Sequence, residues 1–296
     1  MAPSLPEENK KPGVHYAATT DGVELPVVDV THSAFAVSLS QSEQQTLVRK
    51  FLDERVPFAT LPKFLRNRLM QFFLRGSVLS KGIRAAQGSF MRGMDTYLLK
   101  LGPDMLGSYA TPIDRRIAGS LPSLSVRLRL QDMAQLMADA LCVSLSSQPR
   151  RPLHLINIAG GPAIDSLNAL ILLQKNESAT LRDRPVSIHV LDLDDAGPKF
   201  GEAALAALTR EGAPLHGTQI AFRHAPYDWS NPAGLNPVLE EACAKNAIVI
   251  GSSEGGLFEY GSMSRLWEIS RRSKARWNVS SAQSRAQMNR CSAYKK

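Results

Sequence analysis

The sequence predicts an α/β protein in which a parallel β-sheet with helices on both faces follows an N-terminal, mainly helical region. The main observation is the alternation of short apolar strands, tight turns and apolar helices between Leu153 and Ile250. Such alternation is typical of parallel sheets, which bind ligands beyond the carboxyl ends of their strands. A second observation is the helical spacing of apolar residues before Leu141. A third is Arg- and Ser-rich sequence without strand periodicity after residue 264.

Residues 1–127 are expected to form a helical region that covers the ligand site and selects the substrate. Residues 1–15 are rich in Pro and Lys and are expected to be disordered. Residues 22–30, interrupted by Pro26, are compatible with a short edge strand. Ser40 and Glu43 have capping-box spacing and predict the start of a helix. Further apolar runs with helical spacing lie at residues 64–73 and 91–101.

Residues 128–264 are expected to form the domain that contains the sheet. An apolar helix over residues 128–141 precedes the first strand. The predicted strands are residues 153–158, 186–191, 218–222 and 247–250. The predicted helices that follow the first three strands are residues 164–173, 200–210 and 237–245. In a parallel sheet of this kind, functional residues are expected directly after each strand.

The net charge of +8 is carried by the final segment. The chain has 35 Lys and Arg against 27 Asp and Glu, and residues 265–296 contain nine of the basic residues with Glu268 as their one acidic residue. We expect this segment to be a disordered tail that leaves the sheet edge incomplete, through truncation, a shifted reading frame or a short sheet. An exposed edge would favour a homodimer. The basic segment 62–129 is compatible with an acidic substrate, a phosphate-bearing partner, a membrane surface or a solvated helical face.

The composition excludes several classes of protein. With 44% hydrophobic and 21% charged residues, the chain is globular rather than disordered. No run approaches the roughly 18 apolar residues that span a bilayer, and the N-terminus lacks the apolar core of a secretory signal, so we expect a cytoplasmic protein. The separated Cys142, Cys243 and Cys291 exclude a disulfide framework and a Cys-based zinc site, and no metal ligand is predicted.

The turn after the first predicted strand carries the most specific signal. Gly160 and Gly161 lie between this strand and a helix, where backbone N–H groups and the helix N-terminus can face a ligand. The dinucleotide fingerprint G-x-G-x-x-G does not fit, because Pro162, Ala163 and Ile164 follow Gly161. We expect the backbone of Gly161 to approach a ligand closely.

Taken together, residues 130–260 resemble the class I S-adenosylmethionine-dependent methyltransferases, which have a Rossmann-like sheet. The first motif of that family is a buried strand, an acidic residue, an apolar residue and G-x-G-x-G. The segment Ile156 to Ala163 is similar, with Gly161 kept, alanine at the outer two glycine positions and Asn157 at the acidic position. The resemblance implies that S-adenosylmethionine is the cofactor and that this motif contributes Asn157, Ala159, Gly160, Gly161 and Pro162 to its binding.

The second family motif is an acidic residue that ends the second strand and binds both ribose hydroxyls of the cofactor. Asp192 matches this position. A carboxylate can accept two hydrogen bonds from a vicinal diol, which suits it to this role. The alternative is that Asp192, Asp194 and Asp195 cap the next helix.

The resemblance also assigns residues after the third and fourth strands. Tyr227, Asp228 and Trp229 would contact the adenine, although the two aromatic residues could instead close the edge of the core. Ser252 would line the methyl-transfer pocket. The candidate general bases are His224 and Glu254, with a polar surface role as the alternative for both. His154 lies inside the first predicted strand and is expected to be a core residue.

These observations predict a methyltransferase that acts on an oxygen or nitrogen of a small, possibly acidic molecule. A non-catalytic relative that serves as a binding or interaction module is the alternative from another class. A nucleic-acid methyltransferase is a third reading, using the basic segment 62–129. The sequence Ser252-Ser253-Glu254-Gly255 replaces the Asn-Pro-Pro-aromatic signature of enzymes that methylate base amino groups, which argues against nucleic acid as the partner.

Overall fold

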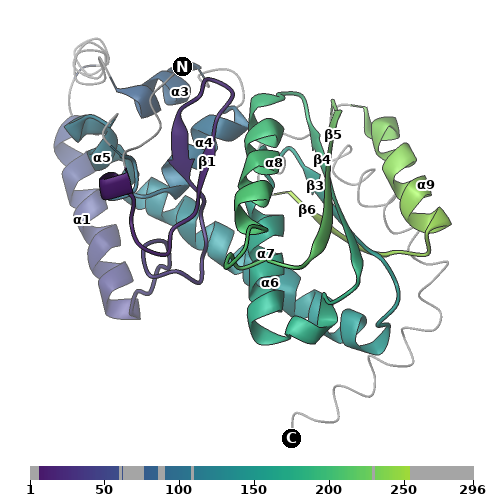
Figure 1. Ribbon diagram of the computed structural model, residues 1–296. Coiled ribbons are helices and arrows are strands. Elements are labelled where there is room, and N and C mark those ends of the chain that lie inside the picture. Colours follow the sequence, from purple (N-terminus) through teal and green to yellow (C-terminus); the bar gives the residue numbers. More distant parts are fainter. Residues whose placement is uncertain are drawn as a thin grey trace, which may run out of the picture.

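The computed structural model describes residues 7–59, 62, 77–85, 91–107, 110–228 and 231–253. Its centre is a parallel four-stranded sheet in the order β5-β4-β3-β6 (Figure 1). The strands are β3 (Leu153–Ile158), β4 (Pro185–Asp192), β5 (Gln219–Pro226) and β6 (Ile248–Ser252). This order, with helices between the strands, makes the fold Rossmann-like and confirms the predicted fold class.

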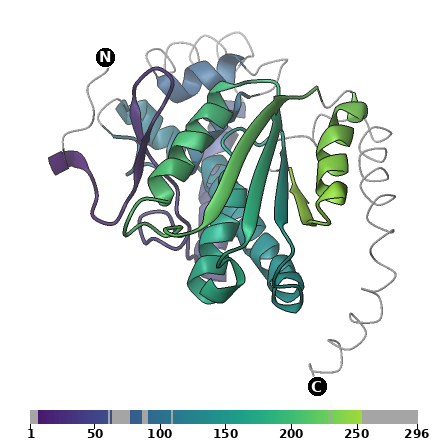
Figure 2. The same ribbon diagram turned by 45° about the vertical axis from the view of Figure 1, so that its right-hand side comes forward.

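Helices cover both faces of the sheet. One face packs against α6, α7 and α8, and the other packs against α9 (Figures 1 and 2). The bounds are α6 (Leu121–Ser147), α7 (Ile164–Asn176), α8 (Ala196–Leu208) and α9 (Asn236–Ala244), with short 3-10 helices η2 (Ser178–Thr180) and η3 (Pro232–Leu235). In the described part of the chain, β6 forms one edge of the sheet and β5 the other.

The side chains of the strands alternate between the two faces. Leu155 and Ile188 belong to the large core beneath α6, α7 and α8, whereas Ile156 and Leu191 belong to a smaller core beneath α9. All six residues of β3 are buried. A central parallel strand that is covered on both faces is mostly apolar, and four of the six residues of β3 are Leu or Ile.

The N-terminal region combines a small hairpin with several helices. The hairpin pairs β1 (Tyr16–Ala18) with β2 (Glu24–Pro26) after a 3-10 turn, η1 (Glu7–Asn9). The helices are α1 (Gln41–Ala59), α3 (Val78–Ala85), α4 (Gly93–Lys100) and α5 (Pro112–Ala118). The predicted capping box of α1 is confirmed, because the Ser40 N–H donates to Glu43 at 2.8 Å and the Glu43 N–H donates to Ser40 Oγ at 3.3 Å.

This region shares one hydrophobic core with the sheet. Asn168 on α7 accepts a hydrogen bond from the Val30 N–H at 2.7 Å and donates to the Val28 carbonyl at 2.9 Å. Tyr97 on α4 donates through its hydroxyl to the Pro26 carbonyl at 2.5 Å. The segment after the hairpin is thereby fixed to both a sheet helix and a helix of its own region.

Several sequence expectations differ from the structure in their boundaries. Strand β5 continues to Pro226, so Arg223 and His224 lie within it rather than after it, because each residue up to Pro226 pairs with β4. Helix α6 runs through the expected boundary at residue 127. Lys10, within the segment expected to be disordered, pairs with Glu24 at 3.0 Å. The predicted helix over residues 64–73 and the tail after residue 264 lie outside the described residues.

Among the described residues, none of the helices combines the length and the apolar character needed to cross a membrane.

Candidate functional site

The loop between β3 and α7 has an unusual backbone. Ala159, Gly161 and Ala163 all have positive φ angles, of 53°, 57° and 53°. These are the three positions that correspond to the glycines of the family motif. Two alanines therefore occupy the left-handed region, where a Cβ costs about 1–2 kcal/mol. The loop therefore has a conformation that glycine adopts without strain, with alanine at two of the three positions.

Residues 160–163 of this loop are buried beneath helices α4 and α8. A Cβ built on Gly93, the first residue of α4, would lie 2.5 Å from the Gly161 Cα, and one on Gly197 of α8 would lie 2.8 Å from it. The backbones of three glycines therefore meet at this point. The backbone of Gly161, which we expected to approach a ligand, contacts the backbones of Gly93 and Gly197 here.

Asp192, at the end of β4, lies beside the loop and is half-buried. Its Oδ2 accepts a hydrogen bond from the Gly161 N–H at 2.9 Å, and its Oδ1 accepts one from the Asp194 N–H at 3.1 Å. Burial raises the pKa of Asp192, and the two N–H donors oppose that increase. Each carboxylate oxygen has two acceptor positions, so each retains one for a further donor.

Asn157 and Ser252 meet below the loop at the carboxyl ends of β3 and β6. The Asn157 Nδ2 donates to Asp165 Oδ1 at 2.6 Å and to Ser252 Oγ at 3.2 Å, and all three residues are buried. A Cβ on Gly160 would lie 1.9 Å from the Asn157 Oδ1. Asn157 therefore supports the loop from the core side, and Gly160 has no room for a side chain.

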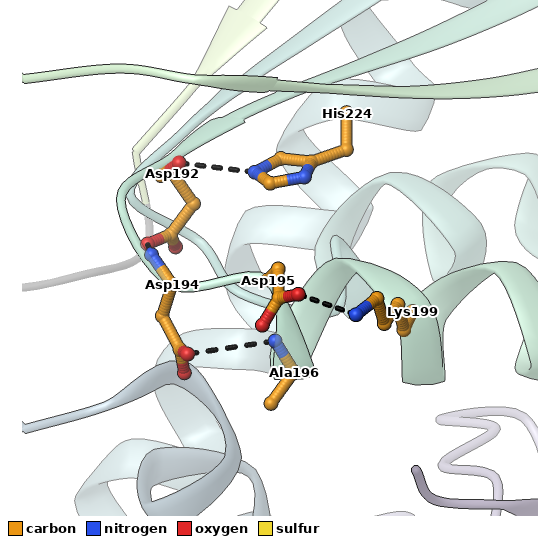
Figure 3. Close-up of polar contacts among 6 residues, drawn as sticks. All are labelled: Asp192, Asp194, Asp195, Ala196, Lys199 and His224. Carbon is orange, nitrogen blue, oxygen red and sulfur yellow. Dashed lines mark hydrogen bonds and ion pairs between the residues drawn. The ribbon is translucent and has the colours of Figure 1, made fainter.

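His224 contacts the backbone of Asp192 rather than its carboxylate. Its Nε2 lies 3.0 Å from the Asp192 carbonyl oxygen, which can only accept, so Nε2 carries the proton (Figure 3). A neutral ring then has its acceptor lone pair on Nδ1. Asp194 and Asp195 interact with the first turn of α8. Asp194 accepts a hydrogen bond from the Ala196 N–H at 3.5 Å, and Asp195 forms an ion pair with Lys199.

The residues expected near the adenine are divided between core and surface. Tyr227 is buried in the smaller core with Leu235, Val238 and Leu239, and its N–H donates to the Asp192 carbonyl at 3.2 Å. Asp228 is exposed. Trp229 and Glu254 lie outside the described residues.

Asp95 on α4 is a further residue of this site that the sequence did not indicate. Burial raises the pKa of Asp95, Arg92 lowers it, and the negative charge of Asp194 raises it again. A Cβ on Gly82 of α3 would lie 2.5 Å from the Asp95 carboxyl carbon, so α3 closes over this side chain. Asp95 and Asp194 make the end of the sheet beside Asp192 acidic, which favours a cationic ligand.

The chain matches no protein-family model, no curated protein and no solved structure with significance. The fold and the arrangement around Asp192 define it as a Rossmann-like α/β protein.

Proposed function

We propose that this protein binds S-adenosylmethionine at the carboxyl ends of β3 and β4 and transfers the methyl group to an oxygen or nitrogen of a small molecule. The observation that carries this proposal is the position of Asp192. Its carboxylate lies against the left-handed loop through the Gly161 N–H at 2.9 Å and retains two acceptor positions. A ribose diol supplies two donors to such a group.

The negative charges near Asp192 are complementary to the positive charge of that cofactor. When bound, S-adenosylmethionine supplies an activated methyl group on a cationic sulfonium. Asp95 and Asp194 would favour a positive charge at this end of the sheet. The protein would mainly orient the acceptor, and His224 or Glu254 would accept its proton.

The buried loop sets a condition on this proposal. Because Gly93 of α4 packs against the Gly161 backbone on a side that α8 does not cover, a cofactor could contact that side only after α4 moves away. Segments that move away to admit a ligand and then close over it are common at active sites. The proposed N-terminal substrate region would then have two positions, one over the loop and one away from it.

A non-catalytic binding or interaction protein is the second candidate. The contact between Gly93 and Gly161 favours it, because α4 already covers the loop that would contact the cofactor. In this reading the left-handed loop and Asp192 hold α4 in place, and the fold serves as a rigid support.

Calorimetric titration of S-adenosylmethionine and S-adenosylhomocysteine into the full chain separates the two candidates. The methyltransferase proposal expects one site for each compound. Transfer of a labelled methyl group to a panel of hydroxyl- and amine-containing acids, with and without the protein, then tests catalysis. Binding without transfer to any acceptor would favour the non-catalytic candidate, and absence of binding would contradict the proposed cofactor.

A further inference from the structure

Two histidines lie side by side on the face of the sheet that α9 covers. His154 is in β3 and pairs with Ser187, whereas His189 is in β4 and pairs with Ile156. Their rings are 4.9 Å apart between centroids, with planes inclined by 31°. Glu241 of α9 joins them: one ring nitrogen of each histidine and one oxygen of Glu241 all lie within 4.8 Å of one another.

The two histidines have unsatisfied polar atoms in the core. His154 is 1% exposed and His189 is 4% exposed. Among the described residues, neither His154 Nδ1 nor His189 Nε2 has a hydrogen-bond partner. Buried polar atoms almost always form hydrogen bonds with protein or ordered water, or bind an ion. We therefore expect a water molecule or an ion to contact these two nitrogens.

Both rings are in the protonation state that binds metals. Burial, reinforced by the neighbouring His189, lowers the pKa of His154 to about 4. Burial also lowers the pKa of His189. At neutral pH each ring is therefore uncharged and has a nitrogen lone pair for coordination.

We propose that His154, His189 and Glu241 bind a divalent transition-metal ion of the zinc type, which links α9 to β3 and β4. Two imidazoles and a carboxylate are a known zinc ligand set, with water completing a tetrahedron. Bond lengths near 2.0–2.1 Å place tetrahedral ligand atoms about 3.4 Å apart, so the three side chains would have to draw together. The sequence alone indicated a core histidine at position 154 and no metal ligand.

The charges around the cluster set the expected affinity. The Glu241 Oε1 accepts from Arg223 at 2.6 Å and from Lys245 at 2.7 Å. The metal would use the other carboxylate oxygen, and the two cations would weaken its binding by repulsion. This site lies on the α9 face of the sheet and does not depend on the proposed cofactor site.

Zinc and cobalt titrations of the chelator-treated full chain test this proposal. We expect one Zn²⁺ per chain by calorimetry, and a visible absorption band of tetrahedral character with Co²⁺. His189→Phe retains an aromatic ring but removes the ligand, and should weaken zinc binding at least about tenfold. His216→Phe is the matched control, because His216 is exposed and lies outside the cluster.

A second variant tests the site without changing the core. Lys245→Gln removes one repelling cation from the exposed end of α9 and should tighten zinc binding severalfold. Absence of stoichiometric binding in the wild-type chain would overturn the proposal. It would also be overturned if zinc affinity were the same in the wild type and Lys245→Gln, or if a folded His189→Phe kept the wild-type affinity.

Discussion

The backbone of Gly93 packs against the backbone of Gly161, so that a Cβ on Gly93 would lie only 2.5 Å from the Gly161 Cα. This contact joins the first turn of α4 to the left-handed loop after β3. It fixes the N-terminal region over the carboxyl end of the sheet, where the candidate site lies. A glycine in each segment is required by this close approach.

The first prediction is that Gly93→Ala lowers the free energy of unfolding by about 1–3 kcal/mol, because the added methyl group has no space. Urea denaturation followed by circular dichroism measures the change. Gly251→Ala is the control: its Cβ would meet its nearest atom at 3.8 Å, so its stability should change little. Equal effects of the two substitutions would show that α4 does not pack on the loop as described.

The same substitution should also affect the cofactor. If α4 must leave Gly161 before S-adenosylmethionine binds, destabilising the closed position should raise the apparent affinity of Gly93→Ala by up to about tenfold. Calorimetry of the wild type and the variant under the same conditions measures this. A lower affinity in a folded Gly93→Ala chain would mean that closure over the loop is not an obstacle to binding.

Asn168 should be the main polar link between the N-terminal segment and the sheet domain. Its side chain forms hydrogen bonds with Val30, Val28 and Ile164. Asn168→Leu keeps the branched shape of the side chain but leaves the Val30 N–H and the Val28 carbonyl without their partner, at a cost of about 2–4 kcal/mol. Hydrogen exchange should accelerate in residues 14–30 before it does in β3. The exposed Asn176, at the end of the same helix, provides the control Asn176→Leu, and matching stabilities would refute the link.

Asp114 should make stability depend on pH. This buried carboxylate accepts from Ser77 at 2.6 Å, from the Leu79 N–H at 3.0 Å and from Thr111 at 2.7 and 2.9 Å. Burial raises its pKa, but these donors outweigh burial and the net pKa is lowered. Its stabilising effect is therefore present above its ordinary pKa and is lost as the pH falls through the lowered value.

Asp114→Asn should accordingly reduce stability by about 1–3 kcal/mol near neutral pH. The difference from the wild type should shrink at pH values below the ordinary pKa of the carboxyl group, about 3.9. Thermal unfolding of both chains across this range provides the measurement. A difference that stays constant with pH would mean that the ionised form of Asp114 is not what stabilises the fold.

The sheet could be predicted from the sequence because its signals are local. Buried apolar runs such as residues 153–158 end at turn residues, and the observed β3 has the same bounds. The capping box of α1 is equally local. Helix α5 was missed although Thr111 and Asp114 have the same capping spacing, with Pro112 at the first helical position.

The remaining features depend on contacts between distant parts of the chain. Asn168 reaches Val30 across 138 positions, and Gly93 meets Gly161 from a separate region. Predicting the ring contact between His154 and His189 requires knowing which strands are neighbours and which residues share a face. None of these relations has a periodic signal, so the burial of the loop and the histidine cluster could be found only from the structure.

The most direct test of the account compares Asp192→Asn with Asp195→Asn in calorimetric titrations with S-adenosylmethionine. Both changes remove one carboxylate, but Asp195 is exposed and pairs with Lys199, whereas Asp192 lies against the loop. We predict that the wild type and Asp195→Asn bind one equivalent with similar affinity. Asp192→Asn should lose about 1.5–3 kcal/mol of binding free energy, as expected for a charge-assisted hydrogen bond. Unchanged affinity in a folded Asp192→Asn chain, or no binding by the wild type, would contradict the proposed cofactor site.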